Sequence, residues 1–288
     1  MNILFFTHNS PWHAPVGGVS TYLSELIPYL LDQGHTVHVL SYVLEDEDLN
    51  NEDISHDNLH IHYANTYPYR TRQKIASILP QSFSAIIHPP YILNAMREAF
   101  QSLTNKHDFD IIETVPYEGL GLIPYYYSDQ PVILRLHLSP TTHPTTLETF
   151  AQESYLKWFF FKARAYLSKK TAEVSNNLVA NSHTTKQYVQ RAWNTEDITT
   201  IHPPVSPPDL NNSLNLDHEF ILSCGRITTG KGFGYIPKTA VNVLKQHPDL
   251  HLYIIGRGSN HSAPTTDDTV LNRIHYTGQI PRNKLLQY

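Results

Sequence analysis

The sequence predicts an α/β protein with two parallel-sheet domains, the second of them incomplete. Short apolar runs alternate with stretches whose apolar residues recur at helical spacing, which is typical of a parallel sheet covered by helices. The alternation is interrupted by four prolines within 202–208 and a polar stretch over 209–217, and then it restarts. We therefore expect an N-terminal domain over 1–203, a linker over 204–217 and a partial C-terminal domain over 218–288.

The first strand, helix and second strand are the clearest of the expected elements. Asn2–Thr7 is a short, nearly all-apolar run, as expected for a strand that is buried on both faces of a parallel sheet. After a loop that ends in Gly17 and Gly18, apolar residues recur at helical spacing as far as Gly34, which suits the end of a helix. The next strand is expected over Thr36–Tyr42.

The same alternation continues along the rest of the chain. Further strands of the N-terminal domain are expected at Leu59–Tyr63, Asp110–Thr114, Val132–Leu136, Asn177–Ala180 and Ile198–Ile201. Helices are expected at Tyr91–Asn105, from Leu147 to about Glu173, and at Ser182–Trp193, which a serine cap opens. The C-terminal domain is expected to hold strands at Phe220–Cys224, Leu252–Ile255 and Ile274–Thr277, with helices at Gly234–Gln246 and from about Pro281.

Composition and charge exclude several classes of protein. Hydrophobic residues make up 40% of the 288-residue chain and charged residues 16%, which suffices for large buried cores. The net charge is −5, so we expect no nucleic-acid partner. Seven of the acidic residues cluster between Glu45 and Asp57, and without them the rest of the chain has a charge of −5 + 7 = +2, which can host an anionic ligand. The single cysteine, Cys224, excludes an internal disulfide, and no apolar run reaches the ~20 residues that cross a bilayer. We therefore expect a cytoplasmic protein.

Gly17 and Gly18 form the first candidate binding site. They directly precede the first expected helix, whose N-terminus offers free N–H groups and a partial positive charge to a phosphate. The loop lacks the spacing of the G-x-G-x-x-G dinucleotide fingerprint. Two glycines in an ordinary turn are the alternative reading.

The turn over 225–232 forms the second candidate site. It follows an expected strand and carries Arg226 and Lys231, two cations suited to a diphosphate. It differs from a Walker A loop because Gly232 stands where a hydroxyl residue would bind magnesium, which favours phosphate binding without magnesium-dependent hydrolysis. Gly256 follows the next strand at the same topological position. A solvated basic turn and an ordinary loop are the respective alternatives.

His137 is the third candidate, because it follows the apolar strand Val132–Leu136 and would lie at the ligand-binding edge of the sheet. No group of His, Cys, Asp and Glu has metal-ligand spacing, so no metal is expected. The aromatic and basic stretch 157–164 is compatible with a helix on a membrane surface. We favour a mostly buried helix whose basic side chains reach outward to water.

Several groups of residues, spread over the chain, are similar in order and spacing to the motifs of one enzyme family. They are Asn2-Ile3-Leu4-Phe5 with Gly17-Gly18-Val19, Asp110-Ile111-Ile112-Glu113, Val132 to His137, Asn177 to Ser182, Gly225-Arg226 with Lys231-Gly232, Tyr253 to Gly256, and Tyr276-Thr277-Gly278. Together they resemble glycosyltransferase family 4, whose members are retaining enzymes of the GT-B fold with two Rossmann-like domains. The resemblance covers essentially the whole chain.

The resemblance implies transfer of a sugar from a nucleotide-diphosphate sugar to an acceptor hydroxyl, with retention of the anomeric configuration. Arg226 and Lys231 would hold the donor diphosphate. The backbone of Gly17-Gly18 and Gly256 would lie close to it. His137 would be the catalytic residue that faces the transferred sugar, where it would hydrogen-bond a hydroxyl or stabilise positive charge. The donor is a substrate, so the resemblance implies neither a cofactor nor a metal.

The sequence also departs from that family. Its members normally carry two glutamates, eight residues apart, on the second domain, and no glutamate follows Glu219 here. We therefore expect little or no transferase activity from this chain alone. The alternative is a non-catalytic fragment or split-enzyme subunit that binds an acceptor or a separately encoded C-terminal half. A nucleotide-dependent dehydrogenase or epimerase is disfavoured by the missing dinucleotide fingerprint.

The expected partners are a nucleotide-sugar donor and an acceptor that the sequence leaves open among glycans, lipids and small molecules. Peripheral contact with the inner face of the membrane is a further alternative to a purely cytoplasmic location.

Overall fold

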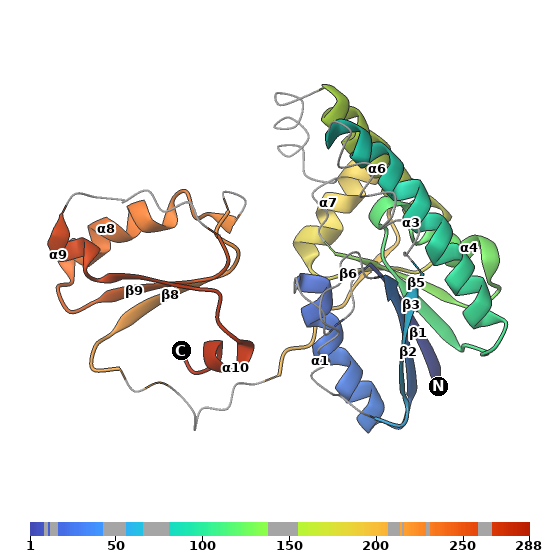
Figure 1. Cartoon of the computed structure of the whole chain (residues 1–288), viewed down its shortest axis with the longest axis horizontal. Helices are drawn as coiled ribbons and strands as arrows, with labels where there is room; N and C mark the ends of the chain where they lie inside the picture. Colours follow the sequence, from blue (N-terminus) through green and yellow to red (C-terminus); the bar gives the residue numbers. More distant parts are fainter. Residues whose placement is uncertain are drawn as a thin grey trace. The chain divides into compact units, whose positions relative to one another are not determined.

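The computed structural model describes residues 1–8, 11, 17–42, 56–65, 81–137, 155–206, 214, 216–228, 231–258 and 267–288. The chain divides into two compact units, Met1–Val205 and Ser206–Tyr288, and each has its own parallel sheet (Figure 1). Most of the expected linker and of the acidic stretch after Glu45 lies outside the described residues.

The sheet of the first unit has seven parallel strands in the order β3-β2-β1-β4-β5-β6-β7. The strands are β1 Asn2–Phe6, β2 Thr36–Tyr42, β3 Leu59–Ala64, β4 Ile111–Thr114, β5 Val132–Leu136, β6 Leu178–Ala180 and β7 Ile198–Thr200. All seven agree with the sequence-based prediction to within one residue at each end. The strand order reverses between β1 and β4, and open parallel sheets bind ligands beyond the carboxyl ends of their strands at such a point.

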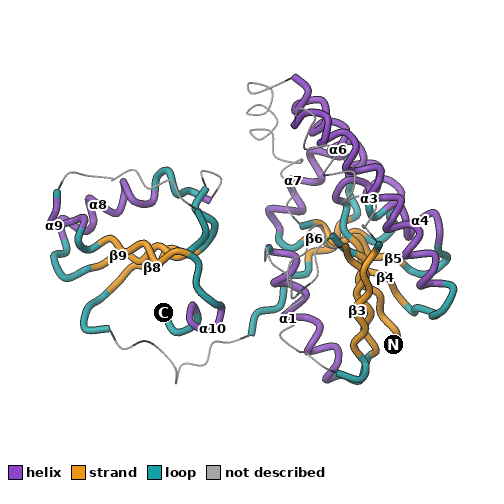
Figure 2. Tube along the Cα trace, in the orientation of Figure 1, coloured by secondary structure: helices purple, strands orange, loops and turns teal. Residues whose placement is uncertain are grey.

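Helices cover both faces of this sheet (Figure 2). They are α1 Gly18–Asp32, α3 Gln81–Thr104, the 3₁₀ turn η1 Tyr117–Gly119, α4 Leu122–Tyr127, α6 Tyr155–Val174 and α7 His183–Trp193. Helix α1 packs on one face, whereas α3, α6 and α7 pack on the other. Helix α1 ends as predicted at Gly34, whose φ of +77° favours glycine.

Three details of the helices differ from the prediction. Helix α3 begins at Gln81 instead of Tyr91, and its first half contains Pro89 and Pro90, which are poor helix signals because proline removes a backbone hydrogen bond. Neither η1 nor α4 was predicted. The prediction of a mostly buried α6 is wrong for its described part, since Phe159 is 54% exposed and Tyr166 59% exposed.

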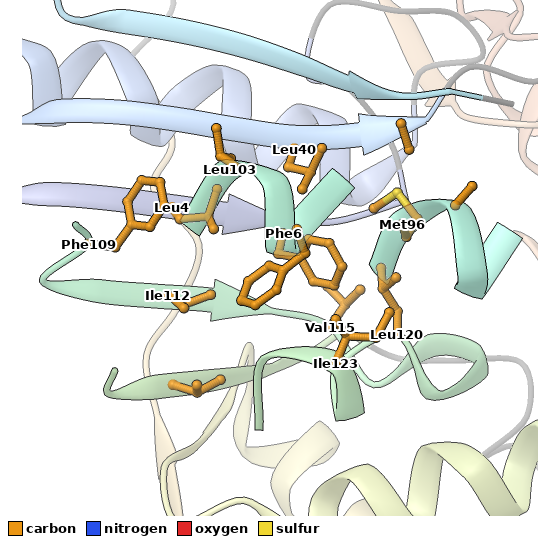
Figure 3. Packing of buried hydrophobic residues seen from close by; sticks show 14 of the residues in the cluster. Leu4, Phe6, Leu40, Met96, Leu103, Phe109, Ile112, Val115, Leu120 and Ile123 are labelled. Carbon is orange, nitrogen blue, oxygen red and sulfur yellow. The ribbon is translucent and has the colours of Figure 1, made fainter. Parts of the chain in front are cut away.

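The core between the sheet and α3 is built from large apolar side chains. Figure 3 shows Phe6 of β1 at its centre, with Leu4 and Ile112 from the sheet and Met96 from α3 around it. Phe6 meets Phe100 edge to face, with ring centroids 5.2 Å apart. This packing fixes β1 and β4, and therefore the edge where their carboxyl ends emerge.

The second unit holds a three-stranded parallel sheet in the order β10-β9-β8. The strands are β8 Phe220–Cys224, β9 His251–Ile255 and β10 Ile274–Gly278, and the helices are α8 Ile236–Gln246, α9 Asp268–Leu271 and α10 Arg282–Leu285. Leu244 of α8 packs against Leu252 and Ile254 of β9. The unpredicted α9 is capped by Asp267, whose carboxylate accepts a hydrogen bond from the backbone N–H of Thr269.

Candidate functional site

His137 lies directly beyond the carboxyl end of β5, at the edge predicted from the sequence. Its Nδ1 accepts a hydrogen bond from the side-chain amide of Asn181, at 2.8 Å. Its ring meets the ring of Tyr22, on α1, edge to face at a centroid distance of 5.4 Å. The imidazole is therefore held from two sides, by the segment after β6 and by the first helix.

A buried ion pair lies beneath His137. An Nη atom of Arg135, on β5, donates to the Glu113 carboxylate of β4 at 3.2 Å, and these side chains are 8% and 12% exposed. The Tyr22 hydroxyl donates to the same carboxylate oxygen at 3.2 Å, and the Arg135 guanidinium lies 4.8 Å from the centre of the Tyr22 ring. Arg135 also donates to the carbonyl of Ile201 at 3.2 Å. One network thus joins α1 to β4, to β5 and to the segment that follows β7.

Burial governs the ionisation of these groups. Burial, with a smaller contribution from Arg135, lowers the pKa of His137 to about 4, so its imidazole is neutral at physiological pH. Burial also raises the pKa of Glu113, whereas the adjacent Arg135 acts in the opposite direction. Because His137 is neutral, it can donate or accept a hydrogen bond, but it carries no charge.

A small cavity of about 10 Å³ lies beside the His137 ring, among Thr7, Tyr22, Glu113 and Thr114. This volume is at the lower limit for one water molecule. The hydroxyl of Thr7 is buried at its wall and makes no hydrogen bond within the described part of the chain. The cavity is therefore suited to a single bound water and is too small for a sugar.

A second polar pair lies at the same edge of the sheet. The carboxylate of Glu118, in η1 after β4, forms an ion pair with Arg164 of α6, whose Nη2 lies 2.6 Å from Oε1 of Glu118. Burial raises the pKa of Glu118, and Arg164 opposes that shift. Glu118 has a φ of +56°, a left-handed conformation that is uncommon outside glycine. The arginine in the aromatic and basic stretch is thus turned toward the sheet edge.

Gly17 and Gly18 begin helix α1, as predicted. Gly17 is its N-cap in an extended conformation (φ −124°, ψ 178°), and a side chain on Gly18 would meet open space. No side chain caps the first turn among the described residues. The N–H groups at this end therefore keep their capacity to bind an anionic ligand.

Arg226 and Lys231 lie in the second unit, after the carboxyl end of β8. Both side chains are exposed, and residues 229 and 230 between them lie outside the described part. The backbone N–H of Ile227 donates to the carbonyl of Arg257, at 2.9 Å, which ties this turn to the turn that follows β9. The structure therefore brings the turn that carries Arg226 beside the Gly256 turn.

Gly256 has a packing reason to be glycine. Its φ is +155°, and a Cβ atom there would lie 1.8 Å from the carbonyl oxygen of Gly225. We expect Gly256→Ala to separate the two turns and to destabilise the second unit by about 2 kcal/mol, whereas Gly234→Ala, at an open position, changes little. Amide hydrogen exchange of β8 and β9 measures this difference. Equal exchange in both variants would contradict the packing explanation.

Sequence reasoning missed Tyr22, Glu113, Arg135 and Asn181 as site residues. The signal for two of them was present: Glu113 and Arg135 are opposite charges near the ends of two short apolar runs. Within the described residues, no group of three or more His, Cys, Asp or Glu side chains could hold a metal ion. No helix in the described part is long and apolar enough to cross a membrane.

Solved structures that are similar to this chain include glycosyltransferases. The chain is similar to sucrose-phosphate synthase from Thermosynechococcus elongatus, with a TM-score of 0.68 and 18% identity over 100% of this chain and 72% of that one. WaaG, described as a glycosyltransferase involved in lipopolysaccharide biosynthesis, matches with a TM-score of 0.57 and 11% identity over the same shares. An E. coli structure described as trehalose-6-phosphate bound with UDP-2-fluoro glucose matches with a TM-score of 0.56 and 12% identity, covering 100% and 76%.

The two parallel α/β units therefore have the GT-B fold. The sequence model of Glycosyltransferase Family 4 matches residues 16–207, which is most of the chain. The chain belongs to that family, as the resemblance implied. A comparison with curated protein sequences found no match.

Proposed function

We propose that this protein transfers a sugar from a nucleotide-diphosphate sugar to an acceptor hydroxyl, with retention of the anomeric configuration. The observation that carries the proposal is the pair of exposed cations, Arg226 and Lys231, at the carboxyl edge of the second sheet in a family 4 chain. Ligands of open parallel sheets bind at this edge, and two fixed cations suit a diphosphate.

Each residue then has a defined part in the reaction. Arg226 and Lys231 bind the diphosphate and stabilise the negative charge that develops as it departs. The N–H groups at the N-terminus of α1, beside Gly17 and Gly18, offer a further anion-binding end, and Gly256 allows the backbone to pass close to the donor. His137 donates a hydrogen bond to the transferred sugar as a neutral imidazole.

Titration of the chain with UDP and GDP by calorimetry tests the donor site. We expect Arg226→Ala and Lys231→Ala each to weaken binding by about 10- to 100-fold, because each removes a charge-assisted hydrogen bond. Lys238→Ala, which removes an exposed charge on α8, serves as the matched control. Unchanged affinity in the two test variants would refute the assignment of the diphosphate site.

We propose that the acceptor is a glycan, a lipid or a small molecule, and that the protein acts in the cytoplasm. The exposed rings of Phe159 and Tyr166 on α6, together with the exposed Lys162, favour peripheral contact with a membrane surface. Sedimentation with anionic vesicles tests this contact, since Phe159→Ser and Lys162→Glu should each reduce the bound fraction.

A second candidate function is that of a subunit whose second sheet another polypeptide completes. Among the described strands β8 pairs only with β9, and Ile221 and Leu222 of β8 are 38% and 39% exposed. The equivalent first strand of the other sheet, β1, is buried between β2 and β4. Slow amide exchange along β8 in the purified chain would argue against this candidate, because it would mean that the strand edge is already protected.

A further inference from the structure

We propose that Asn181 is a positioning residue that holds His137 in the tautomer with its hydrogen on Nε2, so that Nε2–H donates to an oxygen of the transferred sugar. The donation to sugar rests on the proposed function. The hold on the ring itself does not, and it can be tested on the chain without substrate.

The sheet places these two residues side by side. Strands β5 and β6 are parallel neighbours, and their register pairs Leu136 with Ala180. His137 directly follows β5 and Asn181 directly follows β6. The two residues therefore lie side by side at the carboxyl edge of the sheet. The following residue, Ser182, caps helix α7 by accepting a hydrogen bond from the backbone N–H of Thr185 at 3.0 Å. Asn181 is therefore fixed between a strand and a capped helix.

The contact dictates where the ring hydrogen lies. The amide nitrogen of Asn181 is a donor, so Nδ1 of His137, 2.8 Å away, must accept. A neutral imidazole whose Nδ1 accepts carries its hydrogen on Nε2. A protonated ring would instead set an N–H of His137 against an N–H of Asn181, and the contact would be lost. The amide thus selects both the neutral ring and its tautomer.

The other groups around the ring act in the same direction. The ring of Tyr22, on α1, meets the His137 imidazole edge to face, while the Tyr22 hydroxyl donates a hydrogen bond to Glu113 of β4. Arg135 of β5 is a fixed positive charge that opposes protonation of the imidazole. Glu113 is the one anion in this network, and it is bound by both Arg135 and Tyr22. Within the described ranges, Asn181 is therefore the group that bonds a ring nitrogen of His137 and can select its tautomer.

The orientation of the amide is the point that an experiment must decide. Its oxygen is buried and makes no hydrogen bond in the described structure, and its nitrogen faces Nδ1 of His137. A reversed amide would accept from Nδ1–H and leave the opposite tautomer, with a lone pair on Nε2. That ring could accept a hydrogen bond from a sugar hydroxyl but could not donate to an oxygen.

Long-range ¹⁵N–¹H NMR of histidine-labelled protein distinguishes these states directly, and loss of one ring signal in His137→Gln assigns it. We expect wild-type His137 to be the neutral Nε2–H tautomer at pH 7. Asn181→Asp has the same shape but only acceptor atoms, so we expect it to move the hydrogen to Nδ1 and to raise the pKa of the ring. Asn181→Ala removes the contact without providing an acceptor, so we expect it to leave a mixture of tautomers. Its comparison with Asn181→Asp distinguishes the loss of the hydrogen bond from a hydrogen bond in the opposite direction.

Two results would overturn the proposal: an Nδ1–H tautomer in the wild type, or a tautomer that Asn181→Asp leaves unchanged. Sugar transfer is a separate readout. We expect Asn181→Asp to lower kcat about 10-fold with little change in KM for the donor, as loss of one hydrogen bond predicts. Failure to bind UDP or GDP would count against the proposed function alone, because the NMR result depends on neither binding nor transfer.

Discussion

Replacement of Arg135 by methionine is expected to destabilise the first unit by about 3 kcal/mol at pH 7, because it leaves the Glu113 carboxylate buried without its cation. Breaking a buried ion pair typically costs ~3–5 kcal/mol. We expect the lower end, since Tyr22 still donates to Glu113 and the carboxylate is 12% exposed. Methionine keeps most of the volume of the arginine side chain, so the loss reports on charge and hydrogen bonding.

Tryptophan fluorescence during urea unfolding measures this effect in the first unit alone. The three tryptophans, Trp12, Trp158 and Trp193, all belong to residues 1–205, and the second unit has none. Arg191→Met, which removes an exposed arginine from α7, is the matched control and should change stability by less than ~0.5 kcal/mol. Equal effects of the two substitutions would show that the Arg135–Glu113 pair contributes nothing measurable.

The pH dependence separates the charge from other causes. Burial raises the folded-state pKa of Glu113 above its ordinary value, and removing Arg135 raises it further. A carboxyl group whose folded pKa is raised costs stability above that pKa, and the cost disappears as pH falls toward its unfolded value. We therefore expect the deficit of Arg135→Met to shrink as pH falls through the raised folded-state pKa of Glu113. The double variant Glu113→Gln with Arg135→Met should recover part of the loss at pH 7.

The fold follows closely from local patterns in the sequence. Strands such as β1 and β5 are short, largely apolar runs, and burial on both faces leaves little room for other patterns. The prediction failed where local signals conflict with packing. The first half of α3 contains Pro89 and Pro90, and α4 is only six residues long, so neither has the long amphipathic repeat that identifies a helix.

The candidate site was predictable in position but not in its contacts. The sequence placed His137 and the Arg226 turn at carboxyl edges of sheets because each follows an apolar strand. It could not show that Asn181 meets His137, since that contact depends on the register between β5 and β6. The same holds for Gly256, whose close approach to Gly225 arises only when β8 and β9 pair.

Acid is expected to destabilise the first unit through a cluster of four histidines, which lie on β2, on β3 and in the segment before β4. His38 of β2 is 2% exposed, and its Nδ1 lies 3.0 Å from Nε2 of His62 on β3. The rings of His60, His107 and Phe109 lie within 4.6 to 5.1 Å of it, centroid to centroid. Among the described residues, no carboxylate offsets the lowered pKa values of His38 and His62.

Burial, followed by repulsion from His60, His62 and His107, lowers the pKa of His38 to about 4. In the unfolded chain the same group titrates near 6.5. Below that pH the unfolded chain binds a proton that the folded chain does not. The free energy of unfolding is therefore unaffected by His38 above about pH 6.5 and decreases as pH falls toward 4. At 1.36 kcal/mol for each pKa unit, the loss attributable to His38 is about 3 kcal/mol by pH 4.

His38→Phe should remove this sensitivity, because phenylalanine fills a similar volume beside Phe109 and takes up no proton. Urea unfolding followed by tryptophan fluorescence at pH 7, 6, 5 and 4 should show wild type losing about 3 kcal/mol more than the variant over this range. His202→Phe, at an exposed position of the same unit, should keep the wild-type pH profile. Buried His8 and His137 also have pKa values lowered to about 4, so acid still destabilises His38→Phe, but less steeply. Parallel pH profiles for wild type and His38→Phe would mean that the cluster relaxes on protonation, and that its repulsion is relieved without unfolding.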